Sequence, residues 1–285
     1  MGYFYSINAG NTAAFSAIGK IIRAYVTHRL QKPPVPAVVS MPAHDGSYAG
    51  WYEPDSPRVE LTHLLERLLG IVRIRFADNE LLLTSLRERD QVLLPMAAGQ
   101  FRKVPKEGFP DPIATMALLS PNAEGQLVQM EGGKVTMKHI PAWFAIAEIA
   151  LTAWFICAMV SVLCYAPFWL LGGLSRKRRR PAERAVRAWP LVAVLSLVAA
   201  AGILILSGDD FISRMGIWSV WSAAIFLSTL LYGVASAAGA VALWRAPRQA
   251  IRSRVRKYSI VVIPAFLIVA TYLAYWELIG LRTWA

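Results

Sequence analysis

Residues 143–180 of the 285-residue chain decide its architecture. They begin with WFAIAEIALTAWFICAMVSVLCYAPFWLLG (Trp143–Gly172) and end with the basic run SRKRRR (residues 175–180). A helix of roughly 20 apolar residues spans the core of a bilayer, because it satisfies its backbone hydrogen bonds internally. A basic run directly after such a helix favours the cytoplasmic side. We therefore expect a transmembrane helix that ends at a cytoplasmic loop.

Three further stretches are long and apolar enough to span a membrane: Pro190–Leu206, Gly216–Trp244 and Tyr258–Gly280. Together with Trp143–Gly172 they predict a bundle of four transmembrane helices in residues 141–285. The lipid bilayer is then the first partner of this chain.

Charge is distributed unevenly along the chain. The whole sequence has 30 Lys and Arg and 18 Asp and Glu, a net charge of +12. Residues 1–142 hold 15 basic and 13 acidic side chains, whereas the more apolar residues 143–285 hold 15 and 5. A basic excess within an apolar region is typical of a membrane domain with positive loops. It argues against nucleic acid as a partner.

Thirteen basic residues flank the expected spans and determine the orientation. Their loops contain one acid, Glu183, whereas the opposite loop holds Asp209 and Asp210 against Arg214. The positive-inside rule places the basic loops in the cytoplasm, with residues 1–142 and the C-terminus outside. The same basic run also suits nuclear localisation, anionic-lipid capture or nucleic-acid contact, but the topogenic interpretation suffices. The thirteen are Arg176, Lys177, Arg178, Arg179, Arg180, Arg184, Arg187, Arg245, Arg248, Arg252, Arg254, Arg256 and Lys257.

The N-terminal residues 1–32 predict a strand and a helix that need a partner. Tyr3–Asn8 is aromatic and β-branched, and Ala13–Leu30 places its apolar residues at helical spacing. This unit is too small to bury its own apolar face. Three prolines then make residues 33–45 a stiff linker.

Residues 46–140 have the pattern of a small β domain. In Val72–Phe76 apolar residues alternate with Arg73 and Arg75, and Asp78-Asn79 is typical of a turn. A helix is expected at Pro57–Leu69. Six or more short strands predict an antiparallel barrel or sandwich, whose ligand the pattern does not name. The further expected strands are Leu81–Thr84, Gln91–Met96, Gln100–Val104, Ile113–Leu119, Gln126–Met130 and Lys134–Ile140. The predicted fold class is thus an α+β membrane protein.

Two stretches resemble a known family. Gly2–Asn11 (GYFYSINAGN), with the helix that follows, resembles the late strand and C-terminal helix of serine β-lactamase and penicillin-binding-protein-like hydrolases. Tyr48–Arg58 (YAGWYEPDSPR) resembles the start of the β-rich accessory domain that follows the hydrolase domain in some bacterial members. The resemblance covers residues 1–140 and implies a β-lactamase-like catalytic domain, or a separate chain carrying it, as a partner.

The chemistry of that family has no counterpart in this sequence. It needs a nucleophilic Ser-x-x-Lys, and no Ser here precedes a Lys by three residues. Ser6-Ile7-Asn8 and His44-Asp45-Gly46 match family motifs by letters but occur at the wrong places, so no catalytic residue is assigned. The four His are scattered and nucleotide-binding motifs are missing, so we expect neither a metal nor a cofactor. Cys157 and Cys164 are expected to be small buried residues of the first span.

Three functions remain after these exclusions. The preferred one is the non-catalytic accessory and anchor region of a β-lactamase-related serine hydrolase in the bacterial cytoplasmic membrane, encoded by a truncated or split gene. The missing signal peptide at Met1–Tyr5 favours this interpretation. The alternative is a self-sufficient membrane-anchored binding or scaffold protein of the cell envelope. A small transporter has less support, because the spans carry only Glu148 and Glu277 near their outer ends.

Overall fold

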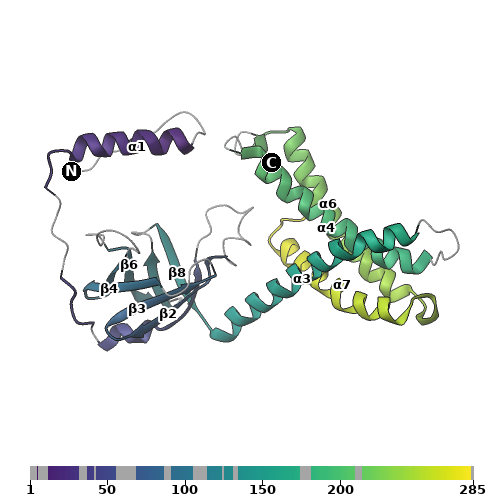
Figure 1. Cartoon of the computed structure of the whole chain (residues 1–285), viewed down its shortest axis with the longest axis horizontal. Coiled ribbons are helices and arrows are strands. Elements are labelled where there is room, and N and C mark those ends of the chain that lie inside the picture. The colour runs from purple at the N-terminus through teal and green to yellow at the C-terminus, as the bar shows by residue number, and fades with distance from the viewer. Residues whose placement is uncertain are drawn as a thin grey trace. The chain divides into compact units, whose positions relative to one another are not determined.

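The computed structural model describes residues 5, 12–31, 37–41, 43–55, 69–86, 91–104, 114–123, 125–130, 134–173, 181–208 and 214–283. It has an α+β fold, in which an eight-stranded antiparallel β-barrel is followed by four long apolar helices (Figure 1). Residues 30–152 form one compact unit, and residues 153–285 with 1–29 form the other. The expected strand Tyr3–Asn8 and the expected helix Pro57–Leu69 lie, apart from Tyr5 and Leu69, outside the described residues.

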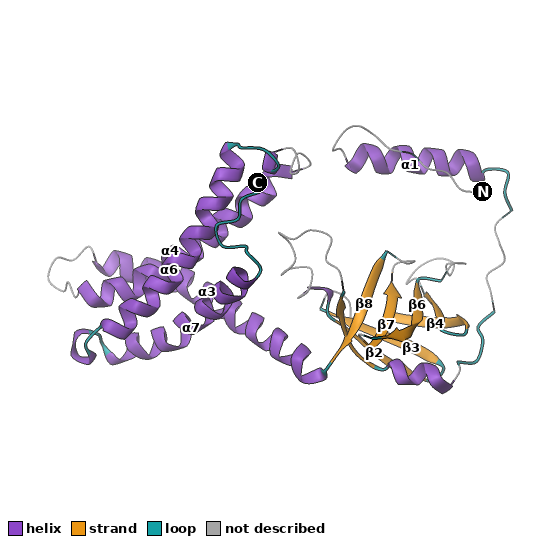
Figure 2. Ribbon diagram, turned by 180° about the vertical axis from the view of Figure 1, so that it is seen from behind, coloured by secondary structure: helices purple, strands orange, loops and turns teal. Residues whose placement is uncertain are grey.

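The barrel is an up-and-down meander in which each strand pairs with its neighbour in sequence (Figure 2). The first strand, which the sequence analysis did not identify, closes the barrel by pairing with the last, Trp51 opposite Ile140. The expected antiparallel barrel is therefore confirmed. Its strands are β1 (Gly50–Pro54), β2 (Val72–Ala77), β3 (Glu80–Ser85), β4 (Gln91–Ala97), β5 (Gln100–Lys103), β6 (Met116–Asn122), β7 (Gly125–Met130) and β8 (Val135–Ile140).

The turn between β2 and β3 also fastens the preceding linker to the barrel. Asp78 and Asn79 both have positive φ, 50° and 63°, as a two-residue type I′ hairpin requires. The Asn79 side chain accepts a hydrogen bond from the Met41 N–H and donates one to the Val39 carbonyl, at 2.7 and 3.1 Å. Residues 39–41, expected in the stiff linker, thus pack on the barrel.

Apolar side chains fill the interior of the barrel. Tyr52, Leu81, Phe101 and Val128 are fully buried there, and Tyr48 joins them from a 3₁₀ helix, η1 (Ala43–Tyr48). The Tyr52 hydroxyl donates to the Tyr48 carbonyl at 2.9 Å. Burial raises the pKa of the Tyr52 phenol, so this hydroxyl stays a neutral donor. These side chains form a packed core inside the barrel.

The four apolar helices are α3 (Ala142–Gly173), α4 (Pro181–Ser207), α6 (Val220–Arg245) and α7 (Ser253–Tyr275). Each is long and apolar enough to cross a membrane. In the described residues these four helices match the predicted spans in number and order, but several ends differ. Helix α4 begins about two turns before Pro190, and α7 ends at Tyr275 because Glu277 takes a left-handed φ of 54°.

Close contacts join α4, α6 and α7. A Cβ at Gly239 of α6 would lie at van der Waals contact, 3.4 Å from the Trp189 Cβ of α4, so the two helices approach each other closely at this glycine. The buried Tyr232 hydroxyl of α6 donates to the Phe266 carbonyl of α7 at 3.0 Å. By contrast, Cys157 and Cys164 are exposed on α3, and the prediction that they are buried is wrong.

The N-terminal helix α1 (Thr12–Thr27) confirms the expected amphipathic helix. Tyr5 covers one edge of its apolar face by stacking on Phe15, with ring centroids 4.5 Å apart. Ile18, Ile21 and Tyr25 remain exposed.

Candidate functional site

The structure places the described members of the predicted basic loops on helix ends or beside them. Arg176, Lys177, Arg178, Arg179 and Arg180 lie outside the described residues. Helix α4 begins at Pro181, earlier than expected, because a proline and an acidic residue such as Glu183 favour the first turn of a helix. The prediction that Arg184 and Arg187 lie in a loop is therefore wrong. The described members are Arg184 and Arg187 in α4, Arg245 ending α6, Arg248 in the 3₁₀ helix η5 (Arg248–Ala250), Arg252 capping α7, and Arg254, Arg256 and Lys257 in its first two turns.

Packing brings these helix ends together at one end of the helical unit. Val186 of α4 packs in one cluster with Ile251 and Val255, which lie in the connection between α6 and α7 and in α7 itself. The Arg256 guanidinium reaches back to the Ala246 carbonyl at 3.4 Å. The start of α4 and the α6–α7 connection therefore form a common surface, which we call the basic end.

A partly buried ion pair lies within the basic end. Arg187 donates from Nη2 to the Glu183 carboxylate at 2.5 Å, one helical turn away. Their side chains are only 15% and 9% exposed. An ion pair so far removed from water is stable only when its remaining donors and acceptors are satisfied. The stability of this pair therefore depends on the guanidinium donors of Arg187 that do not contact Glu183.

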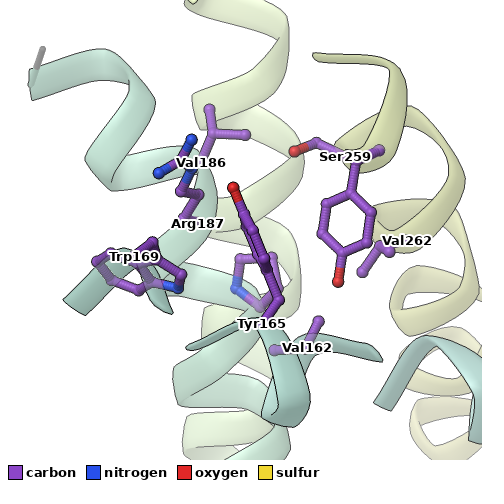
Figure 3. A pocket seen from close by; sticks show the side chains of 9 residues that line it. Val162, Tyr165, Trp169, Val186, Arg187, Ser259 and Val262 are labelled. Atoms are coloured by element: carbon purple, nitrogen blue, oxygen red, sulfur yellow. The ribbon is translucent and has the colours of Figure 1, made fainter. Parts of the chain in front are cut away.

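Aromatic rings connect that pair to two further helices. The Arg187 guanidinium lies over the Tyr165 ring of α3, 5.4 Å from its centroid. Tyr165 in turn packs against Tyr258 of α7 with centroids 5.5 Å apart, and the Tyr258 hydroxyl hydrogen-bonds to Ser161 at 2.9 Å. Figure 3 shows Tyr165 at the centre, between Arg187 and Trp169 on one side and Ser259 and Val262 on the other.

A small pocket opens between these three helices (Figure 3). Its free space matches about one water molecule or one oxygen atom of a ligand. Arg187 Nε is buried and makes no hydrogen bond in the described part of the chain. The lining residues are Val162, Tyr165, Trp169, Val186, Arg187, Pro190, Tyr258, Ser259 and Val262.

Arg187 is recognisable in the sequence as a basic residue beside a span, but the residues around it were not predicted. Ser161, Tyr165 and Trp169 recur at a spacing of four on α3, as do Glu183 and Arg187 on α4. Spacings of four place side chains on one helix face, and this signal was available in the sequence. Which helices those faces meet depends on tertiary packing.

A second feature is the junction between the barrel and the first apolar helix. Strand β8 ends at Ile140 and α3 begins at Ala142, so only Pro141 separates them (Figure 1). Ile140 and Ala145 pack with Ile71 in a buried cluster, which Trp51 of β1 borders. The barrel is therefore packed against the first turns of α3 and does not hang on a flexible linker.

The barrel carries polar groups, but those that the structure describes do not assemble into a metal site. Buried Glu53 faces Lys138 across the β1–β8 pair at 3.5 Å, and the His139 and Tyr52 rings form a T-shaped pair with centroids 5.3 Å apart. Among the described residues, no group of three or more His, Cys, Asp or Glu side chains converges to hold a metal.

Comparison with models of protein families, with curated proteins and with solved structures gives no match for this chain.

Proposed function

We propose that this chain is a non-catalytic accessory region that holds a partner domain at a membrane. The observation that carries the proposal is the junction at Pro141, where the barrel core and the first turns of α3 share a buried cluster. A barrel fastened in this way keeps a fixed relation to the start of the apolar helix. Such an arrangement suits a brace or cover at the membrane surface better than a freely moving binding module.

The partner in this proposal is a β-lactamase-like serine hydrolase domain. Its support is the resemblance of Gly2–Asn11 and Tyr48–Arg58 to that family, together with the missing Ser-x-x-Lys motif. The second stretch supplies Tyr48 and Tyr52 to the barrel core, as the opening of an accessory domain would. The exposed apolar residues of α1 offer that partner a docking face.

In this proposal the chain lies in a bacterial cytoplasmic membrane, with the barrel and the C-terminus outside. The basic end faces the cytoplasm under the positive-inside rule. Its support is the charge asymmetry of the connecting segments and the meeting of Arg187, Arg248 and Arg254 at one end of the helical unit.

One observation favours the alternative of a self-sufficient envelope scaffold. The barrel closes on itself through β1 and β8 and fills its interior with its own side chains. It therefore needs no hydrolase domain to complete its core.

Activity-based labelling distinguishes these proposals. The full chain is purified from native membranes with a mild detergent and treated with a fluorescent penicillin or a fluorophosphonate. The accessory proposal predicts an unlabelled chain that enriches a labelled partner, and a Phe15→Ser/Ile18→Ser variant that loses this partner. A Lys20→Ser variant on the polar face of α1 serves as the control. Labelling of the chain itself contradicts the non-catalytic role, and absence of an enriched labelled partner favours the scaffold.

A further inference from the structure

We propose that the basic end binds the phosphate of an anionic phospholipid at Arg187, in the pocket between α3, α4 and α7. This site is independent of the partner domain proposed above. It follows from the unused donor edge of Arg187, its depth along α4 and the charge around it.

The guanidinium of Arg187 is only partly used within the protein. Nη2 donates to Glu183, and the face of the group lies over Tyr165. Nε is buried and makes no hydrogen bond in the described residues, although it lies in a group that lines the pocket. A buried donor without an acceptor is costly, and an arginine edge matches the oxygens of a phosphate. The pocket has room for one such oxygen.

The depth of these groups matches the headgroup region of a bilayer. Arg187 precedes the apolar stretch that starts at Pro190 by three residues, about 4.5 Å along a helix. Tyr258 opens the apolar part of α7, and Trp169 lies close to the end of α3. Trp and Tyr are enriched at this level, and the lipid phosphates lie there as well.

The surroundings favour an anion. Glu183 balances the charge of Arg187, but it is the only acidic residue in residues 149–208 and none occurs in residues 245–276. Exposed Arg254 and Lys257 add positive charge at the same end. Basic pockets between membrane helices on the cytoplasmic side bind anionic headgroups in this way.

A lipid fits better than a free anion. Beside Arg187, the lining is mostly apolar or aromatic and includes the buried Val162, Val186 and Val262. Such a lining offers few partners to a free phosphate, which needs polar groups on all sides, whereas the phosphate of a lipid keeps its other oxygens in the headgroup layer. We therefore assign phosphatidylglycerol or a similar anionic phospholipid to this site.

The decisive experiment uses a variant that keeps the net charge. In Glu183→Gln/Arg187→Gln the ion pair becomes a neutral polar pair, so no buried charge is left alone and the general attraction to anionic lipid is unchanged. The full chain is reconstituted in nanodiscs of phosphatidylcholine with a minor share of phosphatidylglycerol. Lipid retained after mild delipidation is counted by native mass spectrometry. The matched control, Arg254→Gln, removes one exposed positive charge from the same end without touching the pocket.

We expect the wild-type chain to retain phosphatidylglycerol in preference to phosphatidylcholine. In the double variant this preference should fall about tenfold, which corresponds to one charge-assisted hydrogen bond. Arg254→Gln should stay within about twofold of wild type. Equal retention by wild type and the double variant overturns the proposal. The thermal unfolding midpoint is also measured with inorganic phosphate and with phosphatidylglycerol. An equal rise of the midpoint with both overturns the assignment to lipid.

Discussion

We expect that enlarging one small side chain, Ala145, opens the packed junction between the barrel and α3. Ala145, in the first turn of α3, is completely buried and packs with Ile71 and Ile140. Ala145→Leu adds three carbon atoms where no space exists, and overpacking of this kind costs about 1–3 kcal/mol. Because 1.36 kcal/mol is a factor of ten, the docked end of α3 should open about 5- to 150-fold more often.

Hydrogen exchange followed by mass spectrometry on the full chain in nanodiscs measures this opening. We expect faster exchange at residues 140–149 and in β1, whereas the amides around Phe101 and Leu83 should keep their protection because their core is separate. The control, Ala150→Leu, changes an exposed position of the same helix by the same group. Equal exchange in the two variants would refute a packed junction, and a general loss of protection in the barrel would show that the junction is not a separate element.

Three further predictions concern single contacts. Gly239→Leu should separate α4 from α6 and lower the thermal unfolding midpoint in detergent by the equivalent of about 1–3 kcal/mol. The control Gly202→Leu should not lower it, because no neighbouring atom lies within 4 Å of a Cβ at that position. Equal midpoints of the two variants would contradict the close approach of α4 and α6. Asn79→Gly keeps the left-handed turn but removes two hydrogen bonds. The free energy of local opening at residues 37–41 should therefore fall by about 1–2 kcal/mol, which speeds their amide exchange. Unchanged exchange would mean that the linker is held elsewhere. Tyr52→Phe leaves the Tyr48 carbonyl without its donor and should weaken barrel protection by about 1–3 kcal/mol, measured by the same exchange experiment; full protection would show that water replaces the hydroxyl.

Strands β2, β3 and β4 were predictable because buried side chains alternate in them with more accessible ones. Val72 and Ile74 are buried while Arg73 and Arg75 are exposed, as the alternation indicated. Strand β1 was missed because Tyr52 and Glu53 are both buried, on opposite faces. Its outer face is covered by the α3 junction and by Lys138, so no alternation appears in the sequence.

The four apolar helices were predictable from composition alone, but their ends were not. An apolar count recognises only the part of a helix that suits lipid, whereas α4 begins with the polar residues of the Glu183–Arg187 pair. Likewise, α3 is apolar on all sides, so its composition did not show which of its faces is packed and which leaves Cys157 and Cys164 exposed.

The candidate site was predictable only in part. Basic residues near the spans identified the end of the unit at which Arg187 lies. The stacking of Arg187 on Tyr165 joins residues that are 22 positions apart, and Tyr258 comes from a third helix. Such a contact is fixed by helix packing, which a single sequence does not record.

The most direct test of the account is the side of the membrane on which each unit lies. Both native cysteines are replaced in Cys157→Ala/Cys164→Ala, and single cysteines are introduced as Gln100→Cys in the barrel or Gln249→Cys in η5, both at exposed positions. Intact cells with a permeable outer layer are treated with a membrane-impermeant maleimide. The account predicts labelling of Gln100→Cys at once and of Gln249→Cys only after the membrane is opened. Labelling of Gln249→Cys in intact cells, or the same labelling of both variants, would contradict it.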